Sequence, residues 1–124
     1  MLKLGGLAEL AVVVDDLDAC EAFYTRLLGS KPFEHKPGRH AFYDVSGFRF
    51  LLFIPGCMGS RKAEHCGGPQ HFAFRIEPSQ VESAQKHLRD LGIDYDGPFD
   101  DPGKISIYFS DPAKNRVEYL APTA

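Results

Sequence analysis

Several residue types are scarce in this sequence. The 124 residues contain no tryptophan, two methionines and three cysteines, and the cysteines show no CxxC spacing. An odd number of cysteines without that spacing argues against a disulfide framework. No apolar run approaches the roughly 18 residues of a membrane-spanning helix, and no basic segment followed by a signal-like apolar region opens the chain. We therefore expect a cytoplasmic protein without a membrane partner.

An excess of one charge sign is also missing. Lysine and arginine number 14 against 17 acidic residues, a formal net charge of -3. Such a balance gives no general reason to expect a nucleic acid or an acidic membrane as partner. The fractions of hydrophobic (44%) and charged (25%) residues are typical of a soluble globular protein. A chain of this length can bury a core without disulfides or a structural metal, so we expect one domain over residues 1–124.

The sequence does contain an internal repeat. Residues 9–29 read ELAVVVDDLDACEAFYTRLLG, and residues 71–92 read HFAFRIEPSQVESAQKHLRDLG. Each segment has a strand-like run, a short acidic turn, an amphipathic helical pattern and a closing glycine. Matching order, length and terminator favour a duplicated unit over two units that are similar by chance.

Each predicted helix carries its own start and stop signals. The closing glycines are expected to adopt the left-handed conformation that ends many helices. The start signals are capping-box pairs. The closing glycines are Gly29 and Gly92, and the capping-box pairs are Asp18 with Glu21 and Ser79 with Glu82.

Three strand-like runs follow each helix, and a segment rich in glycine separates the two sets. That segment, residues 55–68, has four glycines and no periodicity, which is typical of a linker. We predict an α+β fold of two tandem βαβββ modules, at about residues 5–55 and about residues 69–122. The strand-like runs are residues 31–36, 40–46 and 48–54 in the first module, and 94–97, 104–110 and 115–121 in the second.

Each module is expected to form a curved mixed sheet with a helix on one side. The opposite sheet faces would then curl around a cavity. Alternation along residues 71–76 sends Phe72 and Phe74 to the helix, and sends His71 and Arg75 to the cavity.

Glu9 interrupts an apolar strand at residues 7–14, whose two faces are otherwise apolar. We therefore expect this strand to be buried on both sides. A lone carboxylate there would cost several kcal/mol unless it is paired, hydrogen-bonded, protonated or bound to a metal. In the repeat, Glu9 takes the place of His71. Glu118 interrupts another apolar strand, where the first module has Leu51.

Glu9, His71 and Glu118 are thus three donor side chains that face the predicted cavity from three strands. One imidazole and two carboxylates resemble a facial non-haem iron site with one histidine replaced. Two carboxylates also balance the charge of a dication and favour Fe(II), Mn(II) or Mg(II) over zinc. Spacing alone leaves the alternative open, in which both glutamates reach water at strand ends and His71 is a hydrogen-bonded core histidine.

The segment ELAVVVDDLDACEAFYTRLLG resembles the opening signature of the vicinal oxygen chelate superfamily. GPQHFAFRI and SIYFSDPAKNRVEYL match the same family, and the resemblance covers essentially the whole chain. That superfamily includes glyoxalase I, bleomycin-resistance proteins, fosfomycin-resistance enzymes and extradiol dioxygenases. The resemblance implies paired βαβββ modules, a homodimer and a divalent ion held by Glu9, His71 and Glu118. Fe(II) or Mn(II) is favoured, and Mg(II) or Zn(II) is possible.

Two positions depart from the family pattern. The family most often has histidine where this chain has Glu9. Glyoxalase I also supplies an acidic ligand from the last strand of its first module, where this chain has Leu51 and Leu52. We therefore do not expect glyoxalase I activity. A three-ligand site leaves positions open for substrate or water.

Further candidates lie on the strand before Glu118. Tyr108 resembles the tyrosine that lines the substrate cavity of dioxygenase and fosfomycin-resistance members, and it is the predicted catalytic residue. Ser106 and Lys104 share its face and, with Arg75, are predicted to contact an anionic substrate. For Tyr108 the alternative is a partly buried strand tyrosine, and for Lys104 it is solvation at a strand edge.

These features predict a metal-dependent enzyme that acts on a small oxygen-chelating substrate. An extradiol-dioxygenase-like or lyase-like reaction is favoured. The alternatives are a transferase or hydrolase of the fosfomycin-resistance type, or a metal-free drug-binding resistance protein. The last would stack a ligand on Phe42, Phe48 or Phe53.

Overall fold

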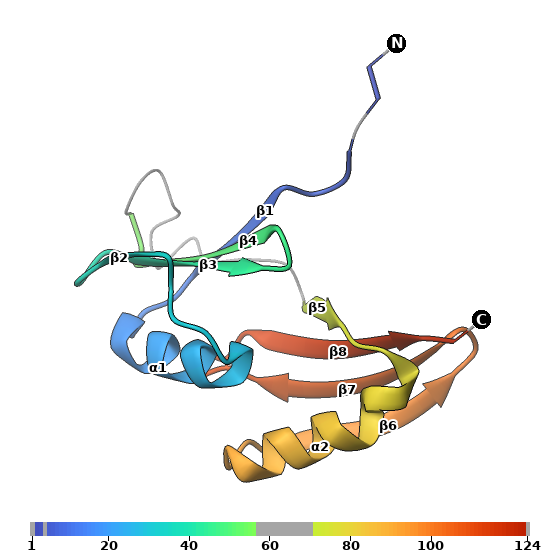
Figure 1. The fold of residues 1–124 in the computed structure, drawn as a ribbon. Coiled ribbons are helices and arrows are strands. Elements are labelled where there is room, and N and C mark those ends of the chain that lie inside the picture. The colour runs from blue at the N-terminus through green and yellow to red at the C-terminus, as the bar shows by residue number, and fades with distance from the viewer. Residues whose placement is uncertain (1, 4, 57–70, 124) are drawn as a thin grey trace. The chain divides into compact units, whose positions relative to one another are not determined.

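The computed structural model describes residues 2–3, 5–56 and 71–123. The chain divides into two compact units, residues 1–68 and 69–124, which we call module one and module two (Figure 1). Apart from its first two residues, the predicted linker lies outside the described residues.

Module one has one helix and one mixed sheet of four strands. The strand order is β1-β4-β3-β2, in which β1 runs parallel to β4 and the other neighbours are antiparallel. The elements are β1 (Glu9–Val13), α1 (Leu17–Leu28), β2 (Glu34–Lys36), β3 (His40–Val45) and β4 (Phe48–Phe53).

Module two repeats this connectivity, with a short 3₁₀ turn before its helix. Its strand order is β5-β8-β7-β6, again with the first strand parallel to the last. The predicted α+β fold of two βαβββ modules is therefore confirmed. The elements are β5 (Phe72–Arg75), the 3₁₀ turn (Pro78–Gln80), α2 (Val81–Asp90), β6 (Tyr95–Asp101), β7 (Lys104–Ser110) and β8 (Arg116–Pro122).

The strand registers confirm the predicted equivalence of positions. Ala11 lies opposite Leu51 in module one, and Ala73 lies opposite Glu118 in module two. Leu51 and Glu118 are thus equivalent residues of the two sheets. Glu9 and His71 each precede the equivalent alanine by two residues.

The helix starts differ from the predicted capping boxes. Asp16, not Asp18, caps α1, and its Oδ1 accepts a hydrogen bond from the Ala19 backbone N–H at 3.0 Å. In module two the capping box joins Glu77 and Gln80, not Ser79 and Glu82. Pro78 fixes a backbone angle suited to a helix start, so the helical turn begins earlier than predicted.

The helix ends agree with the prediction. Gly29 and Gly92 both adopt left-handed conformations, with φ of 71° and 72°. The Gly29 N–H donates to the Thr25 carbonyl at 3.0 Å and closes α1.

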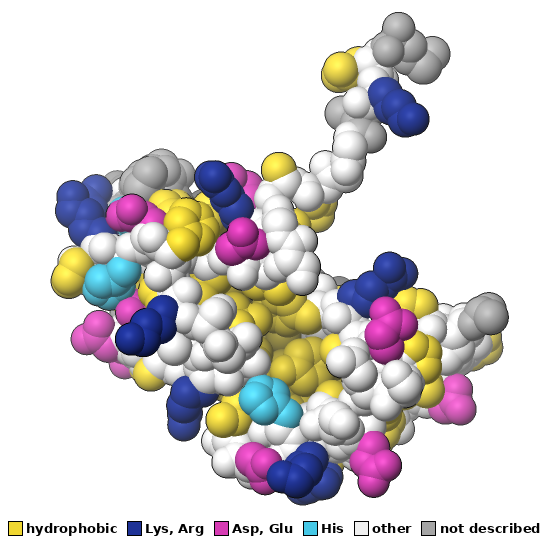
Figure 2. Space-filling model, viewed as in Figure 1, with side chains coloured by type: hydrophobic (Ala, Val, Ile, Leu, Met, Phe, Trp, Pro, Cys, Tyr) yellow, Lys and Arg dark blue, Asp and Glu magenta, His cyan; other side chains and the backbone are white. Residues whose placement is uncertain are grey.

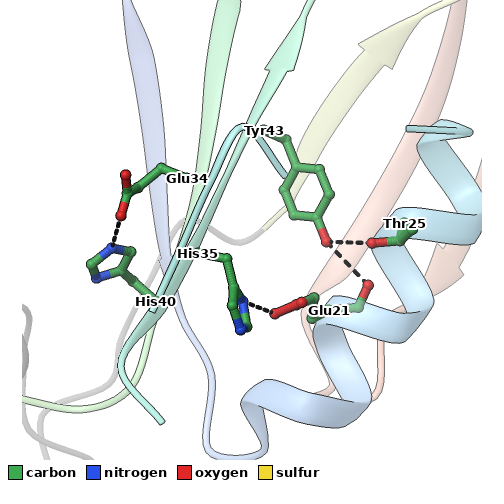
Figure 3. Close-up of polar contacts among 6 residues, drawn as sticks. All are labelled: Glu21, Thr25, Glu34, His35, His40 and Tyr43. Carbon is green, nitrogen blue, oxygen red and sulfur yellow. Dashed lines mark hydrogen bonds and ion pairs between the residues drawn. The ribbon is translucent and has the colours of Figure 1, made fainter. Parts of the chain in front are cut away.

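Helix α1 packs on one face of the module-one sheet. The Tyr24 ring on α1 lies 4.7 Å from the Phe50 ring on β4, centroid to centroid. Tyr43 on β3 also forms hydrogen bonds with α1. Its hydroxyl donates to the Glu21 carbonyl at 3.0 Å and lies 2.9 Å from Thr25 Oγ1 (Figure 3). Burial raises the pKa of Tyr43, so the phenol stays neutral where it makes these bonds.

Removing this hydroxyl should weaken the attachment of α1. We expect Tyr43→Phe to lower the free energy of unfolding by about 1–2 kcal/mol, because the Glu21 carbonyl and Thr25 hydroxyl lose a buried partner. Urea unfolding followed by circular dichroism measures the change. Tyr95→Phe is the matched control, since Tyr95 lies at the less buried edge of module two. Equal effects of the two substitutions would contradict this account.

The core of module two lies on the side of its sheet opposite Glu118. Aromatic rings of β7 and β8 meet there, with Phe109 and Tyr119 centroids 5.0 Å apart. Burial raises the pKa of Tyr119 to about 12. The buried apolar residues of module two are Ala84, Leu88, Ile107, Phe109, Val117, Tyr119 and Ala121.

The pKa of Tyr119 makes the fold sensitive to alkali. Between pH 10 and 12 the unfolded chain loses this phenolic proton while the folded chain keeps it, so the unfolded state binds fewer protons and stability falls as pH rises. The loss should reach about 2–3 kcal/mol near pH 12. Tyr119→Phe should remove this part of the pH dependence in urea unfolding measured at both pH values. If the free energy of unfolding depends on pH in the same way in Tyr119→Phe as in the wild type, burial does not hold the phenolic proton of Tyr119.

Candidate functional site

A polar cluster occupies the face of the module-two sheet opposite the core. Its centre is Glu118 on β8, which is only 1% exposed. Strand pairing sets Glu118 between Ala73 on β5 and Tyr108 on β7. Alternation brings Lys104 and Ser106 to the same face as Tyr108. The sequence prediction therefore grouped these side chains correctly on one face.

Glu118 uses both carboxylate oxygens. Its Oε1 lies 3.1 Å from His71 Nε2. Its Oε2 accepts hydrogen bonds from Ser106 Oγ at 2.7 Å and from Lys104 Nζ at 3.3 Å. The hydrogen bond to Glu118 raises the pKa of Lys104, which therefore stays protonated at neutral pH. These contacts supply the charge and hydrogen bonds that a buried carboxylate needs.

Tyr108 is enclosed by cationic and aromatic side chains. The His71 ring meets it edge to face at 5.9 Å, and the Phe99 ring lies 6.1 Å away. The Arg116 guanidinium stands 5.5 Å from the centre of the Tyr108 ring and also pairs with Asp96. Arg116 was not among the site residues predicted from the sequence. Its position two residues before Glu118, on the same face of β8, was the available signal.

The two remaining predicted residues lie apart from these contacts. Arg75 is exposed at the end of β5, on the same side of the strand as His71 by alternation. Glu9 is exposed at the start of β1 and belongs to module one. The expectation that its strand is buried on both sides was wrong. Ala11 is also exposed, because β1 buries mainly the side that faces α1.

The pair of His71 and Glu118 fits a divalent cation. Two ligand atoms about 2.1 Å from an octahedral ion, at right angles, lie about 3.0 Å apart. His71 Nε2 and Glu118 Oε1 are separated by 3.1 Å, which equally fits a hydrogen bond between them. Within the described ranges, no three His, Cys, Asp or Glu side chains lie together as a metal site. Two of the three predicted ligands are thus adjacent. The role of Glu9 as the third ligand stays a prediction.

The equivalent face of module one is apolar. Leu51 takes the place of Glu118 and forms a buried cluster with Phe53, against which Phe42 packs. The rings of Phe42 and Phe53 are 5.3 Å apart. Phe48, the third predicted stacking residue, lies on the opposite side of β4 by alternation.

His40 is a buried histidine on this apolar face. Its ring stacks on Phe42 at 4.3 Å and is 7% exposed. Its Nε2 lies 3.5 Å from Glu34 Oε1, as Figure 3 shows. The buried Nδ1 has no hydrogen-bond partner within the part of the chain that the structure describes. This placement could not be predicted from the sequence, because a histidine fits the strand pattern on either face.

Side chains of both charge signs are interspersed on the face drawn in Figure 2. This distribution agrees with the small net charge and gives no ground for proposing a nucleic acid partner. No helix among the described residues is long and apolar enough to span a membrane.

The sequence of this chain matches the model of one protein family. Residues 6–119 match the model of the Glyoxalase/Bleomycin resistance protein/Dioxygenase superfamily, and the chain belongs to it. The resemblance seen in the sequence is therefore confirmed.

Relatives of known name lie within this family. The chain is 29% identical to the metallothiol transferase FosB of Bacillus licheniformis over 123 residues, 94% of this chain and 75% of that protein. A lactoylglutathione lyase structure from Agrobacterium tumefaciens is 29% identical, with a TM-score of 0.81 over 95% of this chain and 94% of that one. The fold also matches a mutant FosX from Listeria monocytogenes in complex with Mn(II), at 21% identity and a TM-score of 0.73 over 98% and 93% of the two chains.

Proposed function

We propose that this protein is a divalent-metal-dependent enzyme that acts on a small substrate with two adjacent oxygens. Glu9, His71 and Glu118 are the proposed ligands, and Mn(II) or Fe(II) is the preferred ion. The observation that carries the proposal is the buried Glu118 carboxylate, with one oxygen directed at a histidine nitrogen at the spacing of two metal ligands. A homodimer in the cytoplasm is part of the proposal.

Among reaction types, transfer of a thiol to a fosfomycin-like substrate has the best support. The relative FosB is named a metallothiol transferase and matches 94% of the chain. The position that would supply a fourth, acidic ligand in glyoxalase I is the buried Leu51, which has no donor atom. A lactoylglutathione lyase reaction therefore has less support, even though a structure of that name is similar. A ring-cleaving dioxygenase, favoured from the sequence, has no named relative among those compared above.

The ion and two residues of the chain would have separate roles in such a reaction. The bound ion would act as a Lewis acid that polarises a substrate oxygen. Lys104, held protonated by Glu118, supplies a positive charge next to a proposed metal ligand, where it would stabilise negative charge that develops on the substrate. Tyr108, whose ring contacts His71 and Arg116, is the proposed hydrogen-bond donor to the substrate.

Activity assays with three reaction types test the proposal. Protein loaded with Mn(II) is incubated with fosfomycin and cysteine or glutathione, and loss of free thiol is measured. Formation of lactoylglutathione and oxygen uptake with Fe(II) and catechol are measured in parallel. We expect thiol consumption that depends on metal and falls at least about a hundredfold in Tyr108→Phe. Absence of thiol consumption together with oxygen uptake on catechol would overturn the transferase in favour of a dioxygenase.

A metal-free binding protein is the second candidate. It is supported by the partners of Glu118, since Lys104 balances the buried charge and Ser106 donates a hydrogen bond to it without a metal ion. The aromatic pair of Phe42 and Phe53 offers a stacking surface for an apolar ligand. This candidate predicts thermal melts that added Mn(II) does not change. It also predicts aromatic-ligand affinity that Phe42→Ala reduces and Phe48→Ala, on the other side of the sheet, does not.

A further inference from the structure

The two oxygens of Glu118 have different surroundings. Oε2 accepts two hydrogen bonds, from the hydroxyl of Ser106 and the ammonium of Lys104. Two donors match the two lone pairs of a carboxylate oxygen, so Oε2 has little capacity left for a cation. Within the part of the chain that the structure describes, the one polar contact of Oε1 is His71 Nε2, 3.1 Å away. The carboxylate is thus held so that one oxygen is engaged by the protein and the other points toward the proposed second ligand.

We infer that Ser106 and Lys104 are positioning residues that limit Glu118 to binding a cation through Oε1 alone, and that they thereby make the centre select Mn(II) over Ca(II). The inference rests on the proposed function. Ca(II) takes six to eight oxygens and is often bound by both oxygens of one carboxylate. Smaller cations of octahedral preference accept a single carboxylate oxygen at a shorter distance. Blocking Oε2 therefore penalises Ca(II) more than Mn(II).

The two residues act in different ways. Ser106 is fully buried and neutral, and its short bond to Glu118 crosses from β7 to β8, which are paired along their whole length. It sets the orientation of the carboxylate. Lys104 is partly exposed and charged, so it also reduces the negative charge that Glu118 offers to a cation. Loss of Ser106 should change selectivity, whereas loss of Lys104 should also raise affinity for every dication.

Titration calorimetry of the full chain with Mn(II) and with Ca(II) tests the inference. The measured quantity is the ratio of the two dissociation constants. In the double variant Ser106→Ala/Lys104→Met, the preference for Mn(II) should fall at least about tenfold, because Oε2 becomes free for a bidentate ligand. Ser106→Ala alone should lower it about threefold. The single variant decides the question if the double variant fails to fold by circular dichroism.

Two controls separate positioning from a general structural effect. Ser106→Thr keeps the hydroxyl and should keep the wild-type ratio. Lys86→Met removes an ammonium from Asp90, an exposed ion pair on α2, and should also leave the ratio unchanged. The electron paramagnetic resonance spectrum of bound Mn(II) should change in Ser106→Ala and not in Ser106→Thr, since only the former alters how Glu118 binds.

The outcomes distinguish this inference from the function on which it rests. Tight Mn(II) binding with a ratio that stays within about twofold of wild type in Ser106→Ala would overturn the positioning role and leave the metal centre standing. If the wild-type chain binds neither cation, the metal centre itself fails and the inference fails with it.

Discussion

Glu118→Ala is expected to lower the free energy of unfolding by about 3 kcal/mol. The substitution removes a carboxylate that is 1% exposed and leaves the Lys104 ammonium and the buried Ser106 hydroxyl without their partner. The unpaired Ser106 hydroxyl is the costlier group, because Ser106 is fully buried whereas Lys104 is partly exposed and its ammonium can reach water. Urea unfolding at neutral pH and in the presence of a chelator measures the change without any metal contribution.

Asp90→Ala is the matched control, since Asp90 pairs with Lys86 on the exposed face of α2. That surface pair should contribute little to stability, because both side chains are exposed and solvent screens their charges. Glu118→Gln should fall between the two, because it keeps an acceptor for Ser106 but not the charge that faces Lys104. A loss below about 1 kcal/mol in Glu118→Ala would contradict the view that these contacts hold the sheet face together.

Saturating Mn(II) is expected to raise the free energy of unfolding by about 4 kcal/mol at a concentration of about 1,000 times the dissociation constant. A cation that binds the folded chain and not the unfolded one stabilises it by mass action. His71→Ala should lose this stabilisation at the same Mn(II) concentration, because it removes one of the two adjacent donors. The measurement is urea unfolding with and without Mn(II).

His35→Ala provides the control for this effect. His35 also faces a glutamate, with its Nδ1 2.6 Å from Glu21 Oε1, but it lies in module one and outside the predicted ligand set (Figure 3). The variant should keep the full stabilisation by Mn(II). Equal losses in the two histidine variants would show that Mn(II) binds scattered histidines and no specific centre.

The fold was predictable because the sequence contains an internal repeat, so each module supports the prediction of the other. Two strand–helix–glycine segments with matching order predicted the same connectivity in both modules. The strand registers then showed that Leu51 and Glu118 are equivalent positions of the two sheets. Local boundaries were harder. The predicted capping box at Ser79 was wrong because a 3₁₀ turn begins at Pro78 with Glu77 as its cap. Such a choice depends on small differences between neighbouring polar residues.

The candidate site was predictable only in part. Strand alternation placed Lys104, Ser106 and Tyr108 on one face, because that rule is geometric. It could not show that Ser106 is fully buried against Glu118, since burial depends on the packing of neighbouring strands. From the sequence, Ser106 was therefore predicted only as a contact of the substrate, a role that stays a prediction. In the structure, its hydroxyl holds the carboxylate.

The metal content of the purified protein tests the central claim most directly. Protein prepared without chelators and then loaded with Mn(II) and desalted is analysed by mass spectrometry of the metal, beside Glu9→Ala, His71→Ala and Glu118→Ala. We expect one Mn(II) per chain in the wild type and its loss in all three variants. A wild-type chain that retains no metal, or retention that the Glu118 and His71 substitutions leave unchanged, would contradict it.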